Sequence, residues 1–209
     1  QALFSTFVID ILYTRRNELN DALVQAEKAK YIDELNLKNQ ELERLSQETF
    51  EAIAKAVDAN DPYTAGHSKR VARYAQELAF RLGFSAQEAD EIYHAGLIHD
   101  VGKLGIDNGI INKNGKLTDE EYAEIKRHPS VGYEILKGIS IKGKFAQGAK
   151  CHHERIDGKG YPNHLNDSEI PYLAKIIAVA DAYDAMTSKR PYRDVLPQEV
   201  VREQIESGK

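Results

Sequence analysis

The stretch DPYTAGHSKRVARYAQELAFRLGFSAQEADEIYHAGLIHD, residues 61–100, decides the fold class of this chain. Its first two residues, Asp61 and Pro62, predict the start of a helix. Aspartate caps the free N–H groups of a first helical turn, and proline fits the first position of that turn. The expected helix runs to about Leu82 and ends at Gly83, since glycine is common just past a helix end.

The same kind of signal recurs along the rest of the chain. Ser85 with Glu88 three residues later forms a capping-box pattern, which predicts a second helix that reaches His99-Asp100 and ends near Gly102. Further starts are predicted by the capping box of Thr118 with Glu121 and by Pro129, Pro171 and Pro197. Loops rich in glycine, asparagine or proline are expected over 105–115 and 157–166. No segment alternates polar and apolar residues as a strand does, so the domain is predicted to be all-α.

Amino-acid composition and net charge limit which classes of protein this chain can belong to. The chain has 209 residues, of which 42% are hydrophobic and 29% charged, enough apolar material for one substantial core. Its net charge of -5 argues against binding long nucleic acid through phosphate contacts, although locally concentrated cations can still bind a small anion. Cys151 is the one cysteine, so there is no disulfide framework, and a reducing, cytoplasmic setting is expected.

The N-terminal quarter predicts a long helix. Residues 17–56 contain no glycine or proline and are rich in good helix formers. Leu35 and Leu42 are seven residues apart and Leu45 follows three later, which suits a short coiled-coil seam. We expect a parallel homodimer through this helix. Because two lysines interrupt a strict heptad, a solitary helix lying on the domain is the alternative.

Two domains are predicted: 1–49, a signalling or coiled-coil helix left from a larger sensor protein, and 50–209, a catalytic domain. The chain begins without methionine and stops inside a helical pattern, so we interpret it as a fragment. The apolar stretch 3–13 contains Asp10 and precedes two arginines. It is interpreted as the end of a packed or linker helix, or alternatively as the tail of a membrane helix that tethers the parent protein.

Five of the seven histidines and two aspartates stand out as candidate metal ligands: His67, His99, His128, His152, His153, Asp100 and Asp181. A single histidine is more often a surface or core residue, and His94 and His164 are assigned no site role. Asp181 lies in an otherwise apolar helical segment, where a buried carboxylate without a partner is costly. Together these residues suit a site for two divalent cations.

A charge count indicates the substrate. Two divalent cations exceed the two aspartates and one bridging hydroxide by one positive charge, which favours an anionic phosphate ester. Paired metals also activate water and hold the attacking and leaving oxygens of a displacement. Lys103 lies one helical turn beyond His99 if the helix continues, which would place an ammonium beside that water or a phosphate oxygen; an exposed lysine is the alternative.

The motifs resemble a known family. HDVGK at 99–103 resembles the HDxGK motif of the HD-domain phosphohydrolases, and HHERIDGKGYP at 152–162 resembles the HHExxDGxGYP motif of the HD-GYP subfamily. The segments 61–67, 128–129 and 181–193 fit the same subfamily, so the resemblance covers the chain from about residue 50 onward. It implies a bacterial phosphodiesterase that converts cyclic di-GMP to pGpG, GMP or both. It also implies iron or manganese as metals, although nitrogen and oxygen ligands also admit zinc, cobalt or nickel.

The resemblance also implies roles for individual residues. It assigns His67, His99, Asp100 and Asp181 to one metal. It makes Asp100 the bridge to a second metal, held by His128 and His152 with His153 as ligand or close neighbour. Lys103 would assist the bridging hydroxide. Substrate contacts are implied for Gly160, Tyr161, Pro162, Arg190 and Arg193, and supporting positions for Asp184, Glu154 and Asp157.

Several of these assignments keep an alternative. The two arginines can be solvated surface residues, Asp184 can accept a hydrogen bond elsewhere, and Glu154 can simply orient its loop. Cys151 is interpreted as a small buried hydrophobe, although its oxidation would perturb the neighbouring histidine pair. Some subfamily members hold a third metal through a glutamate four residues before the first ligand; that position here is Tyr63, so two metals are expected.

Four functions compete. The first is an active cyclic di-GMP phosphodiesterase regulated through the N-terminal helix, with partner proteins of the diguanylate cyclase type. The others are a non-catalytic module that binds the nucleotide or a partner, an HD phosphohydrolase for another nucleotide, and a diiron oxygenase. Every ligand position that the resemblance implies is filled, which favours the active enzyme.

Overall fold

A computed structural model describes the chain except residues 1, 62–64, 140–142, 189–194 and 208–209. The chain divides into two compact units, residues 1–47 and 48–209. One helix, α1 (Ala2–Asn60), contributes to both units: most of it forms the first, and its last turns belong to the second. The two units are described separately.

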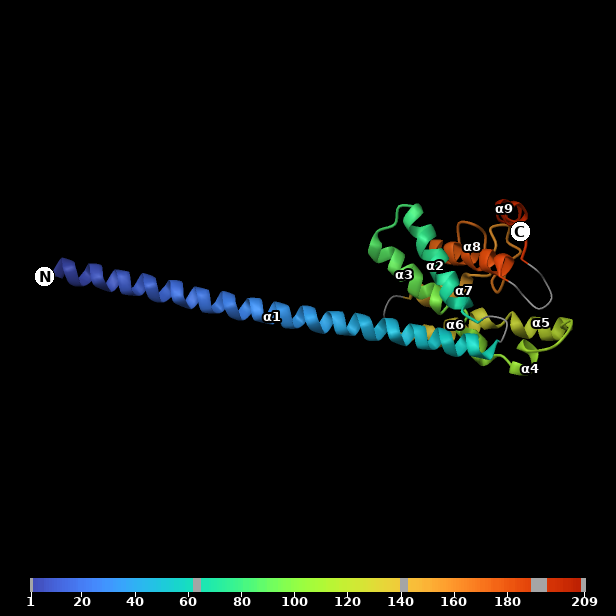
Figure 1. The fold of residues 1–209 in the computed structure, drawn as a ribbon, viewed down its shortest axis with the longest axis horizontal. Coiled ribbons are helices and arrows are strands. Elements are labelled where there is room, and N and C mark those ends of the chain that lie inside the picture. The colour runs from blue at the N-terminus through green and yellow to red at the C-terminus, as the bar shows by residue number, and fades with distance from the viewer. Residues whose placement is uncertain (1, 62–64, 140–142, 189–194, 208–209) are drawn as a thin grey trace. The chain divides into compact units, whose positions relative to one another are not determined.

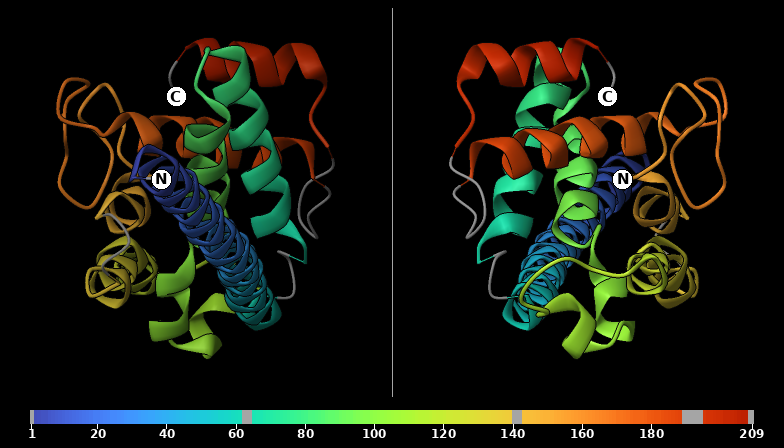
Figure 2. Two further views of the ribbon diagram at one scale, coloured as in Figure 1. Left: turned by 90° about the vertical axis from the view of Figure 1, so that its left-hand side faces the viewer. Right: turned by 90° about the vertical axis from the view of Figure 1, so that its right-hand side faces the viewer.

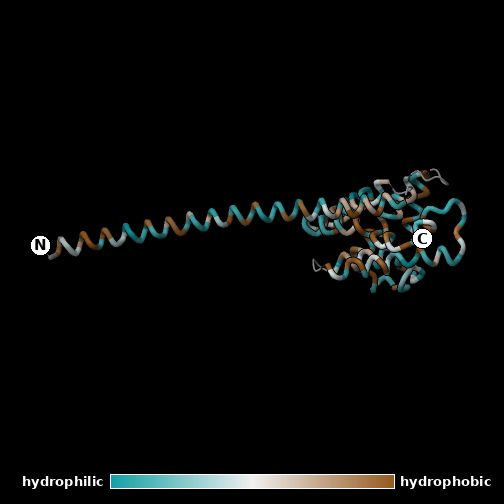
Figure 3. Tube along the Cα trace, turned by 90° about the horizontal axis from the view of Figure 1, so that it is seen from below, coloured by the Kyte–Doolittle hydropathy of each residue, from teal (hydrophilic) through white to brown (hydrophobic). Residues whose placement is uncertain are grey.

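The first unit is a single helix whose side chains from 3 to 45 are exposed to solvent. Hydrophobic positions recur along it between hydrophilic ones (Figure 3). They include Leu35, Leu42 and Leu45, with 46%, 63% and 56% of their surface exposed. Across the part of the chain that the structure describes, no helix has the length and hydrophobicity needed to cross a membrane.

The second unit is built from helices and connecting loops (Figure 1). After α1 these are α2 (His67–Arg81), α3 (Ala86–Leu97), the 3-10 helix η1 (Val101–Gly105), α4 (Asn108–Ile111), α5 (Asp119–Ile125), α6 (His128–Leu136), α7 (Lys144–Cys151), α8 (Tyr172–Thr187) and α9 (Gln198–Glu206). Within the described residues the only β-type pairing is an isolated bridge between Asp157 and Asn166. The prediction of an all-α fold with a long N-terminal helix is confirmed.

The capping signals mark most helix starts correctly. Ser85 and Thr118 each form the predicted capping box, with Glu88 and Glu121 closing it. Pro171 and Pro197 immediately precede α8 and α9. The N-terminal caps of these helices therefore follow from local sequence.

The predicted helix start at Asp61 is wrong. The helix α2 begins at His67, because Gly66 has a left-handed backbone with φ of 70° that no helix continues through. At the other end of the stretch, α3 stops at Leu97, and His99-Asp100 fall in a turn before η1. The helix α7 carries no capping side chain and was not predicted.

Small residues let the helices of the second unit pack closely. The helix α2 contacts α3 and α8, and α7 contacts α3, α6 and α8 (Figure 2). Ala72, Ala75 and Ala79 line the buried face of α2 and have no exposed surface. Phe50 and Val57 from the last turns of α1 join the same core. This frame brings together the ends of α2, α3, α6 and α7, where the candidate ligands lie.

Candidate metal centre and its cleft

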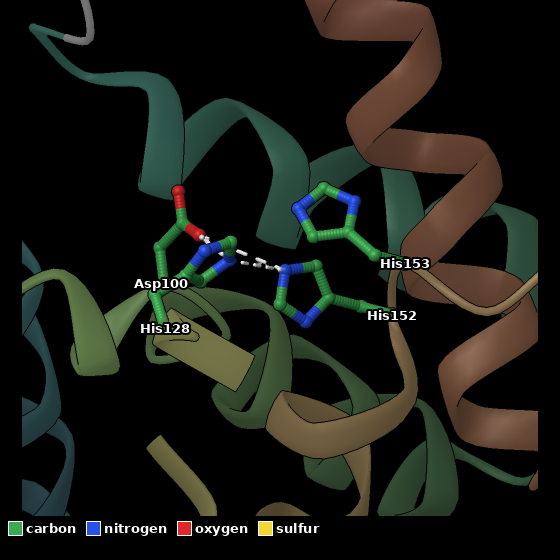
Figure 4. Close-up of side chains that lie close together, drawn as sticks. All are labelled: Asp100, His128, His152 and His153. Atoms are coloured by element: carbon green, nitrogen blue, oxygen red, sulfur yellow. Dashed lines mark hydrogen bonds and ion pairs between the residues drawn. The ribbon is translucent and has the colours of Figure 1, made fainter. Parts of the chain in front are cut away.

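The structure brings six of the seven candidate ligands into two groups that share Asp100. One group is Asp100, His128, His152 and His153, and the other is His67, His99 and Asp100; in each, the ligand atoms lie within 4.8 Å of one another. Figure 4 shows the first group, with His128 and His152 converging on the Asp100 carboxylate. The seventh candidate, Asp181 on α8, places its Oδ1 3.2 Å from His67 Nε2.

A glycine allows two of these ligands to meet. A Cβ atom added to Gly102 would lie 1.8 Å from the carbonyl oxygen of His128. Only glycine therefore lets η1 pack directly against the start of α6. That approach holds Asp100 Oδ1 at 3.2 Å from His128 Nε2. This contact is the physical reason for the glycine in the HDVGK motif.

Three of the candidate ligand histidines are each oriented by a hydrogen bond that their Nδ1 donates. His99, His128 and His152 donate to the backbone carbonyl oxygens of Gly96, Ile125 and Ala149, at 2.7, 2.7 and 2.8 Å. Because a carbonyl oxygen only accepts, Nδ1 carries the proton and Nε2 presents a lone pair to the centre. This is the usual arrangement of a histidine that binds metal through Nε2.

The lone pairs need a cation between them. The Nε2 atoms of His128 and His152 face each other at 3.3 Å, and in the tautomer whose Nδ1 donates to the backbone both present lone pairs. His99 Nε2 and Asp100 Oδ1 are buried and make no hydrogen bond within the described residues. Buried polar atoms are almost always satisfied, and unsatisfied ones commonly mark an ion or water. The residues present therefore fit divalent cations.

The protonation states of His99, His153 and Asp100 also suit metal binding, because ligands must be deprotonated. Burial lowers the pKa of His99 to about 4 and also lowers that of His153, so both are neutral. Burial alone would raise the pKa of Asp100, but Lys103 and the histidines hold it well below its usual range. Burial alone would likewise lower the pKa of His67, but Asp181 and Asp184 raise it to about 9. A cation bound at His67 must therefore displace a proton.

Asp184 lies behind His67, on α8. Its Oδ2 accepts a hydrogen bond of 2.8 Å from His67 Nδ1, and 1% of its side chain is exposed. Arg70 also binds it, with Nε 2.6 Å from Oδ1 and Nη2 3.0 Å from Oδ2. Sequence reasoning missed Arg70, although its place one helical turn after His67 puts both on one face of α2. Two N–H donors of one guanidinium, that of Arg70, thus fix the carboxylate that orients His67.

Lys103 points to the shared carboxylate. Its Nζ lies 2.7 Å from Asp100 Oδ2 and 3.5 Å from Asp61 Oδ2, and 17% of its side chain is exposed. Burial by itself would lower the pKa of Lys103, but the two carboxylates outweigh it and raise the pKa. Lys103 is therefore a fixed ammonium at the edge of the centre.

The loop that carries the Gly-Tyr-Pro turn is held by Glu154. This buried carboxylate accepts hydrogen bonds from the backbone N–H of Asn163 at 2.6 Å and of Leu165 at 3.0 Å. A Cβ atom on Gly160 would lie 2.4 Å from Glu154 Cα, so the turn packs on the chain just after the histidine pair. Glu154 thus orients the loop, and Gly160 is buried within it.

The remaining predicted residues have different surroundings. The Tyr161 ring stacks on His153, with centroids 4.7 Å apart and planes at 28°. The next residue, Pro162, is half-buried. Asp157 pairs with Arg155 at 2.7 Å near the surface, away from the ligand groups. The predicted substrate contacts Arg190 and Arg193, and Tyr63, lie outside the described residues.

A cavity of roughly 370 Å³ opens beside the ligand groups. His152, His153 and Asp181 are among the residues that line it, and Tyr161 forms part of its wall. Most of the other lining side chains belong to α8 and to the loop before it. The candidate metal centre is therefore reachable by a small molecule.

Comparison with known proteins identifies the class. Residues 31–202 match the family described as HD domain. The 3'3'-cGAMP-specific phosphodiesterase 3 of Vibrio cholerae is 44% identical over 148 residues, which are 70% of this chain and 32% of that protein. The cyclic di-GMP phosphodiesterase response regulator RpfG of Xanthomonas campestris is 41% identical over 158 residues, 74% of this chain and 41% of that protein.

A solved structure shares the fold. Bd1817, an HDG"Y"P protein from Bdellovibrio bacteriovorus, superposes with a TM-score of 0.60 at 19% identity, covering 78% of this chain and 59% of that one. The chain therefore belongs to the HD domain family, and its recognition as an HD-GYP domain from the motifs is confirmed. It spans less than half the length of the two curated relatives named above.

Proposed function

We propose that this chain is the catalytic part of a metal-dependent phosphodiesterase that hydrolyses cyclic di-GMP to pGpG, GMP or both. The observation that carries the proposal is the pair of ligand groups that share Asp100, beside a cleft that His152, His153 and Asp181 line. Two divalent cations held there would polarise a phosphodiester and lower the pKa of water beside it.

The chain's own residues then have distinct tasks. The four histidines with anchored Nδ1 atoms and the carboxylates of Asp100 and Asp181 would hold the cations, with His153 as a further ligand or neighbour. Lys103 keeps a proton at Nζ and faces Asp100 Oδ2, where its charge would stabilise the attacking hydroxide or a phosphate oxygen. Tyr161 presents an aromatic wall beside the centre, which suits stacking on a purine.

The names of the relatives support a cyclic dinucleotide as substrate. RpfG is named for cyclic di-GMP, and the Vibrio cholerae relative for 3'3'-cGAMP. Both compounds carry two phosphodiesters and at least one guanine, so the same centre can act on either. The 44% identity to the second relative makes 3'3'-cGAMP the alternative substrate.

The test is a metal analysis combined with a substrate panel. Protein purified without oxygen is expected to contain about two divalent ions per chain, preferably iron or manganese. Two are expected because Tyr63, a neutral phenol with a reference pKa of about 10, replaces the carboxylate that a third ion would need.

In the same assay, chromatography is expected to show cyclic di-GMP converted to pGpG or GMP faster than 3'3'-cGAMP and cyclic di-AMP. Tight binding without turnover would instead establish a non-catalytic sensor. Turnover that requires oxygen would establish an oxygenase. Three fully occupied metals would contradict the assignment of Tyr63.

We further propose that residues 1–49 form a signalling helix that pairs with a second copy in parallel, and that 50–209 form the catalytic domain. The seam leucines are exposed in a single chain, which supports a partner for that face. Replacing Leu35 and Leu42 with lysine is expected to shift the protein from dimer to monomer in light scattering. Leu37→Lys, at a position off the seam that is 66% exposed, is the control. A wild-type monomer at high concentration would refute the pairing and leave the catalytic proposal intact.

A further inference from the structure

One face of α8 lines part of the cleft. Lys175, Val179 and Ala182 follow helical spacing along it, and Asp181 adjoins the candidate metal centre. Lys175 and Asp181 are six residues apart, which is about 9 Å along a helix axis. The cleft is thus lined both by three candidate ligands, His152, His153 and Asp181, and by the cationic Lys175.

Much of the remaining lining is apolar, and its other cation, Arg155, is paired with Asp157. Ile156 and Val179 keep 57% and 39% of their surface exposed although they border the cleft. Ile205 of α9 contributes from the opposite side. Apolar walls with a few placed polar groups are typical of a small-molecule site and suit the flat face of a nucleobase.

Lys175 is paired with a solvent-exposed carboxylate. Lys175 Nζ lies 2.7 Å from Asp167 Oδ1, and 67% of the Asp167 side chain is exposed. An ion pair this exposed contributes little, so a phosphate oxygen can take the place of Asp167. Lys175 is therefore a cation in the lining of the cleft whose carboxylate partner an incoming phosphate can replace.

We propose that this cleft binds the second nucleotide of the substrate, and that Lys175 binds the phosphodiester that is not being cleaved. The inference rests on the proposed function, because it needs a substrate with two phosphates and two bases. It makes Lys175 a specificity residue that distinguishes cyclic dinucleotides from simple phosphodiesters.

The test compares two substrates in the metal-loaded protein. Lys175→Met is expected to raise KM for cyclic di-GMP about tenfold, the scale of one charge-assisted hydrogen bond, with kcat nearly unchanged. Hydrolysis of bis(p-nitrophenyl) phosphate, which has one phosphodiester, is expected to stay within twofold. Asp167→Asn, which removes the competing carboxylate, is expected to lower KM for cyclic di-GMP severalfold.

The matched control is Lys137→Met, because Lys137 also pairs with a nearby carboxylate, that of Glu134, but lies outside the cleft. Lys137→Met is expected to leave the hydrolysis kinetics of both substrates unchanged. The inference is overturned if Lys175→Met keeps KM for cyclic di-GMP within twofold of wild type. It is also overturned if the substitution slows the hydrolysis of both substrates equally. A wild-type protein that cleaves neither substrate would overturn the proposed function itself, and the cleft assignment with it.

Discussion

Replacing Asp100 with alanine is expected to abolish hydrolysis and to release bound metal. Asp100 is the carboxylate common to both ligand groups: its Oδ1 faces His128 Nε2 at 3.2 Å and its Oδ2 faces His99 Nε2 at 3.5 Å. Without it, each group loses its shared anion, and two cations would repel each other with less charge between them. Loss of a ligand at such a site lowers metal affinity by far more than the 10–100-fold typical of a supporting residue.

The measurement is metal content and cyclic di-GMP turnover on the same anaerobic preparation, with circular dichroism to verify that the helices form. Asp119→Ala is the control, since Asp119 is an exposed aspartate in the first turn of α5, away from the ligand groups. An Asp100→Ala protein that keeps both metals and full turnover would show that Asp100 does not bridge them.

Replacing Lys103 with methionine is expected to leave metal content intact and to lower kcat by roughly 10²-fold or more, the usual scale for a placed proton donor or charge-stabilising group. Lys103 belongs to neither ligand group, yet its ammonium lies 2.7 Å from Asp100 Oδ2. Methionine keeps the apolar stem and removes the charge.

Metal content and kcat, measured on the same preparation, distinguish a catalytic role of Lys103 from a structural one. Metal loading within error of wild type together with a large fall in kcat identifies Lys103 as part of the reaction. Lys113→Met is the control, because Lys113 makes an equally short ion pair, 2.6 Å to Glu121, without facing the centre. Unchanged turnover in Lys103→Met would reduce Lys103 to a structural partner of Asp100.

The helical class and the chemistry of the site were predictable from sequence because both depend on local features. The capping boxes at Ser85 and Thr118 satisfy free N–H groups within a few residues, so they act whatever the rest of the chain does. The ligand types follow similarly from composition. A histidine pair at 152–153 and an aspartate in an apolar helix are unusual wherever they occur.

The start of α2 shows where local signals fail. Asp61-Pro62 is a valid helix start, but the left-handed backbone at Gly66 places the helical run at His67 instead. Gly66 belongs to the motif segment 61–67, and only its backbone conformation shows that it also breaks the helix. The absence of capping signals likewise hid α7, which forms because Phe145, Ala146 and Ala149 are buried in the core.

Sequence alone determined that this chain is helical, belongs among the HD-GYP domains and carries histidines and aspartates suited to divalent metals. The tertiary structure decided how those residues combine. His67 and Asp184 are 117 positions apart, yet their hydrogen bond and the support from Arg70 exist because α2 packs against α8. Likewise, Lys175 and the candidate ligands line the same cleft only because of which face of α8 borders it. Such pairings are set by the packing of distant helices, which no local signal along the chain encodes.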